Sequence, residues 1–125
     1  NCVPMEMGDE AEKRGATVIG ISSDHYRDAP RRDKQGRHLR DVCDFYINNH
    51  VPHGDAVVGV GEDVKAGPVS SISGFFIANS IILAACEELS RRGFTPPVFK
   101  SGNVAGGDSY NSQILGRYMS RIKHL

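Results

Sequence analysis

The segment Glu10–Ser23, EAEKRGATVIGISS, constrains the fold of this chain more than any other stretch. It predicts the end of a helix, with Lys13 and Arg14 in the last turn, where cations favour the helix dipole, and Gly15 as the terminating residue. A short apolar run over residues 17–21 follows, and its β-branched side chains are typical of a strand covered on both faces. A helix followed at once by a buried strand predicts an α/β fold.

Strands and helices alternate along the rest of the chain. Apolar runs predict further strands, and helical periodicity predicts further helices. The expected strands are 45–48, 56–60 and 96–101; the expected helices are 4–14, a short one ending near 41, 70–92, and a last one capped by Asp108. Residues 61–69 are expected to form a loop. The alternation predicts a parallel sheet flanked by helices. The helix 70–92 is apolar nearly all round, so we expect it to be central, and its polar interruptions argue against a membrane span.

The composition excludes several classes of protein. The 15 basic and 15 acidic side chains of the 125 residues give a net charge of +0, so no overall field attracts nucleic acid or an anionic membrane. Cys2, Cys43 and Cys86 form no CxxC pair and predict small buried thiols in a reducing, cytoplasmic compartment. The length suits one domain. The chain opens directly on a helix at Asn1, which predicts a piece of a longer protein.

Polar residues follow the first predicted strand, at the edge where open α/β sheets bind their ligands. Ser22 and Ser23 offer hydroxyl groups there, and the alternative is a solvated turn. Asn79 and Ser80 interrupt the apolar helix and need hydrogen-bond partners, either in the backbone or in a polar pocket. Asn103 lies in a glycine-rich loop that either cradles a ligand at a helix N-terminus or makes a tight connection.

The loop His50–Asp55, HVPHGD, places two imidazoles and a carboxylate close together. His-x-x-His in a loop is a weak metal signal, so we favour a polar site lining or solvent exposure and expect no metal and no cofactor. The basic stretch from Arg27 to Arg40 is diluted by acidic residues. It predicts a solvated loop, from which one arginine can still reach a ligand. Phosphate-loop and dinucleotide-binding motifs are absent from the sequence.

Several segments together resemble one family. MEMGDEAEKRGATVIGISS resembles the helix and strand that follow the phosphosugar loop of sugar isomerase (SIS) domains. The strings HVPHGDA and GPVS resemble an uncharacterised branch of that family, described as phosphosugar isomerases. The resemblance covers nearly all 125 residues, but only the later part of such a domain. It implies a flavodoxin-like parallel sheet, incomplete at its N-terminus, a homodimer built on helices, and a phosphorylated sugar bound at the strand ends.

The resemblance also implies roles for individual residues in sugar binding. Asn1 corresponds to the last position of the phosphosugar loop, so Asn1 and Ser22 would line the site, with Ser23 beside them. Asn79 stands where phosphoheptose isomerases place a catalytic histidine. We count Asn79 and Asn103 among the candidate phosphosugar-binding residues.

An aldose–ketose isomerase moves a proton between adjacent carbons and needs a positioned base. The candidates are Glu6, near the expected phosphate loop, and His50 or His53, in the strand-end loop. Two other functions stay open at this point. Related SIS domains cleave an ether from an amino-sugar phosphate, and a domain of this kind can also act as a non-catalytic phosphosugar sensor.

Overall fold

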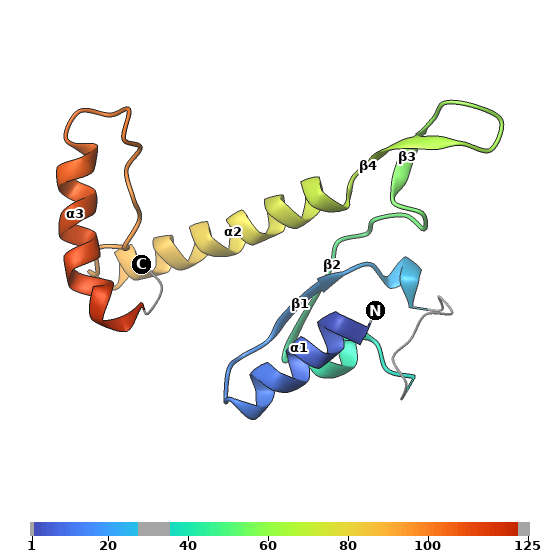
Figure 1. The fold of residues 1–125 in the computed structure, drawn as a ribbon, viewed down its shortest axis with the longest axis horizontal. Helices are drawn as coiled ribbons and strands as arrows, with labels where there is room; N and C mark the ends of the chain where they lie inside the picture. Colours follow the sequence, from blue (N-terminus) through green and yellow to red (C-terminus); the bar gives the residue numbers. More distant parts are fainter. Residues whose placement is uncertain (1, 28–35, 123–125) are drawn as a thin grey trace. The chain divides into compact units, whose positions relative to one another are not determined.

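The computed structural model describes residues 2–27 and 36–122, in two compact units, Asn1–Ile81 and Ile82–Leu125. Asn1, expected in the sugar site, lies outside the described residues. The elements are α1 (Cys2–Lys13), β1 (Ile19–Ser22), β2 (Phe45–Asn48), β3 (Ala56–Gly59), β4 (Lys65–Pro68), α2 (Ser70–Arg91) and α3 (Gly107–Tyr118), with short 3₁₀ helices η1 (Asp24–Tyr26), η2 (Leu39–Val42) and η3 (Met119–Arg121) (Figure 1).

The first helix and the first two strands form as predicted. Gly15 follows the end of α1 at a φ of 71°, the left-handed conformation expected of a terminating glycine. β1 and β2 pair in parallel, with Ile19 opposite Phe45 and Ser22 opposite Asn48. The chain is therefore a mixed α/β structure with a parallel strand pair, and this sheet has two strands among the described residues.

The third strand forms but joins a different sheet. β3 pairs antiparallel with β4 in a hairpin, and Val60 N–H closes its end by donating to Val64 O at 2.9 Å. The prediction of a loop over residues 61–69 was wrong for β4. Its sequence, Lys-Ala-Gly-Pro, has little intrinsic strand preference, and the short connection to β3 supplies the pairing instead.

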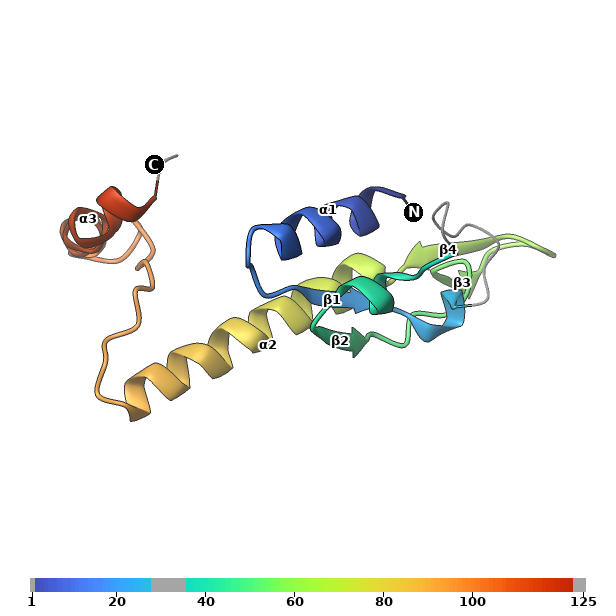
Figure 2. The same cartoon turned by 90° about the horizontal axis from the view of Figure 1, so that it is seen from below.

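Close packing joins α1, η2 and β1 in the first unit (Figure 2). Met5 and Val51 are 2 % and 3 % exposed. A Cβ added to Gly8 would lie 3.0 Å from a methyl group of Val42, so α1 approaches η2 closely. A Cβ added to Gly20 of β1 would lie 2.8 Å from the sulfur of Cys43, directly after η2, so β1 also approaches this segment closely. These glycines bring the backbone of η2 against both neighbours.

Helix α2 forms over the predicted range but lacks the expected burial. Throughout its described length it has no buried residue, and Phe76 is 74 % exposed. By length and composition alone α2 could cross a membrane, which for a single helix is weak evidence of a span. The apolar pattern was correctly identified as a helix. The apolar pattern does not show which segment covers the helix, and the described residues 2–27 and 36–122 leave it uncovered.

Two predictions for the second unit were wrong. Residues 96–101 form no strand within the described chain; instead the backbone N–H and C=O of Lys100 bond the side chain of Asn111, each at 2.8 Å. A strand needs a neighbouring strand to bond these groups, and here an amide side chain serves. Asp108 lies in the first turn of α3, whereas Gly106, at a φ of 76°, is the N-cap residue.

The cysteines were expected to be buried and are not. Cys2 is exposed, Cys43 and Cys86 are half-buried, and all three thiols are free. Cys2 opens α1 and Cys86 lies on the uncovered α2, so neither is enclosed by other elements.

Candidate functional site

The carboxyl ends of β1 and β2 meet at one edge, because the two strands run parallel. Ser23, directly after β1, is 5 % exposed; its hydroxyl donates to Val51 O at 2.5 Å and accepts from the N–H of His25 at 3.2 Å. These bonds fix the loop after β2 against β1. Ser22 is half-buried and borders two cavities at the strand end.

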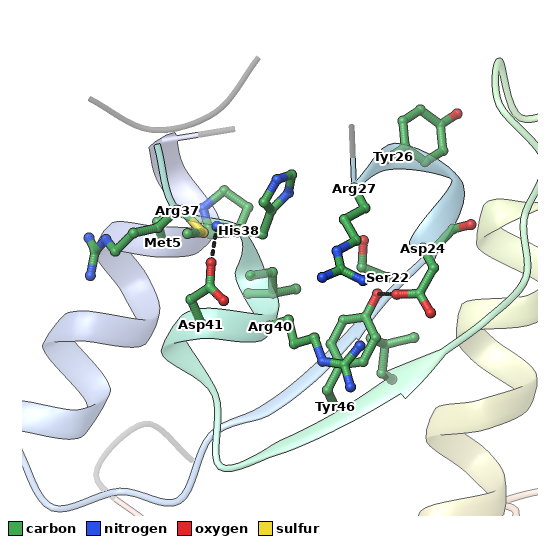
Figure 3. Close-up of a pocket in the computed structure, with 14 residues that line it drawn as sticks. Met5, Ser22, Asp24, Tyr26, Arg27, Arg37, His38, Arg40, Asp41 and Tyr46 are labelled. Atoms are coloured by element: carbon green, nitrogen blue, oxygen red, sulfur yellow. Dashed lines mark hydrogen bonds between the residues drawn. The ribbon is translucent and has the colours of Figure 1, made fainter. Parts of the chain in front are cut away.

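The first cavity has a volume of about 230 Å³ and lies among β1, η2 and the start of α1 (Figure 3). We call it the arginine cavity, because Arg27, Arg37 and Arg40 border it. Figure 3 shows Arg27 and Ser22 on one side, with Met5 and His38 on the other. Guanidinium groups recognise phosphate and carboxylate with paired hydrogen bonds, so this lining suits an anionic ligand.

The arginines of this cavity have different partners. Arg37 donates two hydrogen bonds, at 2.9 and 2.8 Å, to the carboxylate of Asp9 on α1. These bonds lower the pKa of Asp9 below its ordinary value, so the pair stays ionised and joins α1 to the chain before η2. The guanidinium carbon of Arg40 lies over the ring of Tyr46, 5.2 Å from its centroid, in a cation–π contact.

A polar network holds the β1 side of the cavity. Tyr46 O–H donates to one oxygen of Asp24 at 3.1 Å, and Asn48 Nδ2 donates to the other at 2.8 Å. Burial and then this bond to Asp24 raise the pKa of Tyr46, which keeps the phenol protonated. The carboxylate of Asp24 is therefore positioned by two side chains of β2, next to Ser22.

His38 lies within the basic stretch from Arg27 to Arg40, and the sequence did not single it out. It borders the arginine cavity just before η2, and Asp41 accepts from its backbone N–H at 2.7 Å. Among the described side chains, its Nε2 is the one buried polar atom without a hydrogen-bond partner. A single histidine in a basic stretch gives no sequence signal that separates it from the arginines beside it.

The second cavity has a volume of about 290 Å³ and lies between the loop after β2 and the start of α2. We call it the Asp55 cavity; besides Ser22 and Ser23, it is bordered by Asn49, Asp55 and Ser70. Asp55 caps α2, because its Oδ1 accepts from the N–H groups of Val69 and Ser70 at 2.9 and 2.7 Å. Its Oδ2 accepts from the Ser70 hydroxyl at 2.6 Å.

The structure brings Ser22 and Ser23 together and places the other described candidates elsewhere. Glu6 and His50 are exposed, and His53 stacks on the ring of Tyr26 at 5.3 Å. Asn79 Nδ2 donates to Phe75 O at 2.9 Å and Ser80 Oγ to Phe76 O at 2.8 Å, as the backbone alternative predicts. Asn103 belongs to the second unit. Of the described residues that line the two cavities, none is Glu6, His50, His53, Asn79 or Asn103.

No cluster of three metal-ligating side chains occurs among residues 2–27 and 36–122. His50 and Gly54 both have positive φ angles in their loop, 54° and 88°.

Comparison with known proteins gives relatives over almost the whole chain. No family model matches. The homologues of this chain are UPF0309 proteins. One from Halalkalibacterium halodurans is 38 % identical over 98 % of the chain, one from Shouchella clausii is 36 % identical over 100 %, and one from Caldanaerobacter subterraneus is 33 % identical over 100 %.

This chain covers 50 %, 52 % and 52 % of those three UPF0309 proteins, so it spans about half the length of the curated relatives it matches. The matches to the Shouchella and Caldanaerobacter UPF0309 proteins cover the whole chain, and both cavities therefore lie in the shared region. All three organisms are bacteria. The UPF0309 designation names no ligand and no reaction.

Proposed function

We propose that this chain is the later part of a SIS-type, flavodoxin-like domain that binds a phosphorylated sugar and isomerises it between aldose and ketose forms. The observation that carries the proposal is the position of Ser22, at the carboxyl end of a parallel strand and on the border of a cavity that Arg27 and Arg40 also line. The resemblance to SIS domains gives the sugar phosphate as the ligand. With it we propose a cytoplasmic homodimer.

The chemistry of the arginine cavity fits both parts of such a ligand. Arg27 and Arg40 suit the phosphate, and the Ser22 hydroxyl can donate to a phosphate oxygen. The carboxylates of Asp24 and Asp41 suit sugar hydroxyls, which donate hydrogen bonds. A lining with both charges favours a molecule that carries an anion at one end and hydroxyls along the rest.

One observation favours a second function, that of a non-catalytic phosphosugar sensor. The three candidate bases, Glu6, His50 and His53, are all outside the described linings of the two cavities. A site that binds a sugar phosphate but lacks a base would bind without turnover. Among the described lining residues, His38 offers an imidazole that the isomerase function can use.

The test is calorimetric titration of the complete protein with hexose and heptose 6-phosphates, including the amino-sugar forms. Ser22→Ala should lose about 1–3 kcal/mol of binding free energy, or roughly 5- to 150-fold in affinity, if a hydrogen bond to phosphate is lost. Ser73→Ala is the matched control, because the Ser73 hydroxyl donates to Ser70 O within α2.

Three outcomes separate the functions. A product with the same mass as the substrate supports the isomerase. Cleavage of an ether from an amino-sugar phosphate supports the ether-cleaving lyase, and tight binding without turnover supports the sensor. Turnover with and without a chelator shows whether a metal takes part. Absence of binding to every sugar phosphate, or equal affinity of Ser22→Ala and wild type, would contradict the proposed site.

A further inference from the structure

The two cavities at the strand end differ in charge although they share a wall. Ile21, Ser22, Ser23 and Tyr26 border both. The arginine cavity is bordered by three arginines and two aspartates among the described residues, and one of these arginines, Arg37, is paired with Asp9 outside the lining. The Asp55 cavity has Asp55 as the single charged side chain of its described lining. A ligand lying across Ser22 would therefore meet arginines on one side, and on the other a carboxylate with no cation in the described lining.

The start of α2, which would ordinarily attract an anion, is already occupied. Free N–H groups and the helix dipole make such an end favourable for phosphate. Here the carboxylate of Asp55 accepts from the N–H groups of Val69 and Ser70 and from the Ser70 hydroxyl. These hydrogen bonds lower the pKa of Asp55, and the bond from the Ser70 side chain contributes most. Asp55 is therefore ionised at neutral pH. A phosphate in this cavity would face a fixed negative charge.

Sugar hydroxyls fit the Asp55 cavity for the same reasons. A hydroxyl can donate to a carboxylate oxygen that accepts a single bond here, and Asp55 Oδ2 is such an atom. Asn49 adds a neutral amide, whose Oδ1 accepts from Val51 N–H at 3.2 Å. Serine, asparagine and carboxylate groups without a cation are a lining for a polyhydroxy chain.

We propose that the Asp55 cavity is a subsite for the polyhydroxy end of the sugar, which excludes the phosphate and so fixes the ligand with its phosphate in the arginine cavity. This inference rests on the proposed function and deepens it. Asp55 and Asn49 then select the sugar by binding its hydroxyl groups, and Arg27 and Arg40 bind the phosphate. Ser22 lies at the border between the two ends of the ligand.

The test compares inorganic phosphate with a hexose 6-phosphate on the complete protein. Asp55→Asn removes the charge at constant shape, and Asn49→Ser removes the amide while a hydroxyl can keep the local turn. Each variant should weaken the sugar phosphate about tenfold and change the affinity for inorganic phosphate less than twofold. Arg40→Gln is the matched comparison, because it should weaken both ligands by a similar factor. Asn49→Ser keeps the test valid if Asp55→Asn does not fold.

The failures of the two proposals can be told apart. A wild-type protein that binds no sugar phosphate overturns the proposed function and this subsite with it. A wild-type protein that binds sugar phosphate, with Asn49→Ser and Asp55→Asn at wild-type affinity, overturns the subsite alone. Equal weakening of inorganic phosphate and sugar phosphate in these variants also overturns it, because the phosphate would then lie in the Asp55 cavity.

Discussion

Gly20 of β1 leaves no room for a side chain, and this connects the packing of the strand to the arginine cavity. A Cβ at this position would lie 2.8 Å from Cys43 Sγ and 3.2 Å from Leu39 Cγ. Leu39 begins η2, the segment that carries Arg40. Gly20→Ala must therefore displace Cys43 and Leu39, and we expect it to lower stability and to weaken phosphosugar binding together.

The magnitude follows from two opposing effects. Overpacking a filled core costs about 1–3 kcal/mol. Replacing glycine by alanine at a compatible backbone position gains about 0.4–1 kcal/mol, because the unfolded chain loses conformational freedom. The midpoints leave a net loss of roughly 1.3 kcal/mol, and in a domain of about 150–250 residues this lowers the melting temperature by about 3–5 °C.

Thermal unfolding of the complete protein measures the loss of stability, and titration with a hexose 6-phosphate measures the loss of phosphosugar binding. Gly59→Ala is the matched control, because a Cβ there meets nothing within 4 Å. It should be neutral or slightly stabilising. Cys43→Ala in the Gly20→Ala background removes the sulfur and should restore part of the loss. A Gly20→Ala protein as stable as wild type, or an equal loss in Gly59→Ala, would refute the argument.

Three further predictions concern stability and assembly. Folding lowers the pKa of Asp55, so its carboxylate stabilises the protein at pH values above its unfolded pKa near 3.8, and this stabilisation disappears as the pH falls through the folded pKa. Asp55→Asn should therefore have a smaller free energy of unfolding than wild type at pH 7 and lose less of it on acidification, as measured by urea unfolding. Ile114→Ala, at a 6 % exposed position of α3, should cost about 2–5 kcal/mol, as measured by hydrogen exchange of that helix. Phe76→Asp should reduce the dimer fraction in ultracentrifugation if the exposed face of α2 forms the proposed homodimer, and an unchanged fraction would contradict this role.

The sequence predicts the location of the site because the location follows from topology. Two β-branched or aromatic runs separated by a long polar stretch predict a parallel pair, and a parallel pair puts both carboxyl ends at one edge. Ser22 and Asn48 are opposite each other in the register for this reason. The bounds of β2 and the end of α1 at Gly15 were likewise correct, because each depends on local residues.

Hydrogen bonds and packing contacts between residues distant in the sequence could not be predicted in the same way. Ser22 and Ser23 look alike as neighbours, yet the hydroxyl of Ser23 bonds Val51 O, 28 positions away, and the side chain of Ser22 hydrogen-bonds Tyr46. An apolar helix such as α2 is recognised from its own period, whereas its burial depends on other segments. β4 was missed because its pairing is supplied by β3 and not by its own composition.

The charge distribution was the least predictable property of the site, because the composition of a stretch does not show which charged side chains pair with each other. The acidic residues within the basic stretch from Arg27 to Arg40 were taken to dilute it, which predicted a solvated loop, and residues 28–35 of this loop lie outside the described residues. In the structure Asp9 pairs with Arg37 and Asp24 accepts from Tyr46 and Asn48, so the negative charges have fixed places. Asp55 is fixed in the same way at the start of α2. Arginines thus border one of the two cavities at Ser22, together with Asp24 and Asp41, whereas Asp55 is the single charged group in the described lining of the other. This difference gives a direction to any ligand that carries an anion at one end.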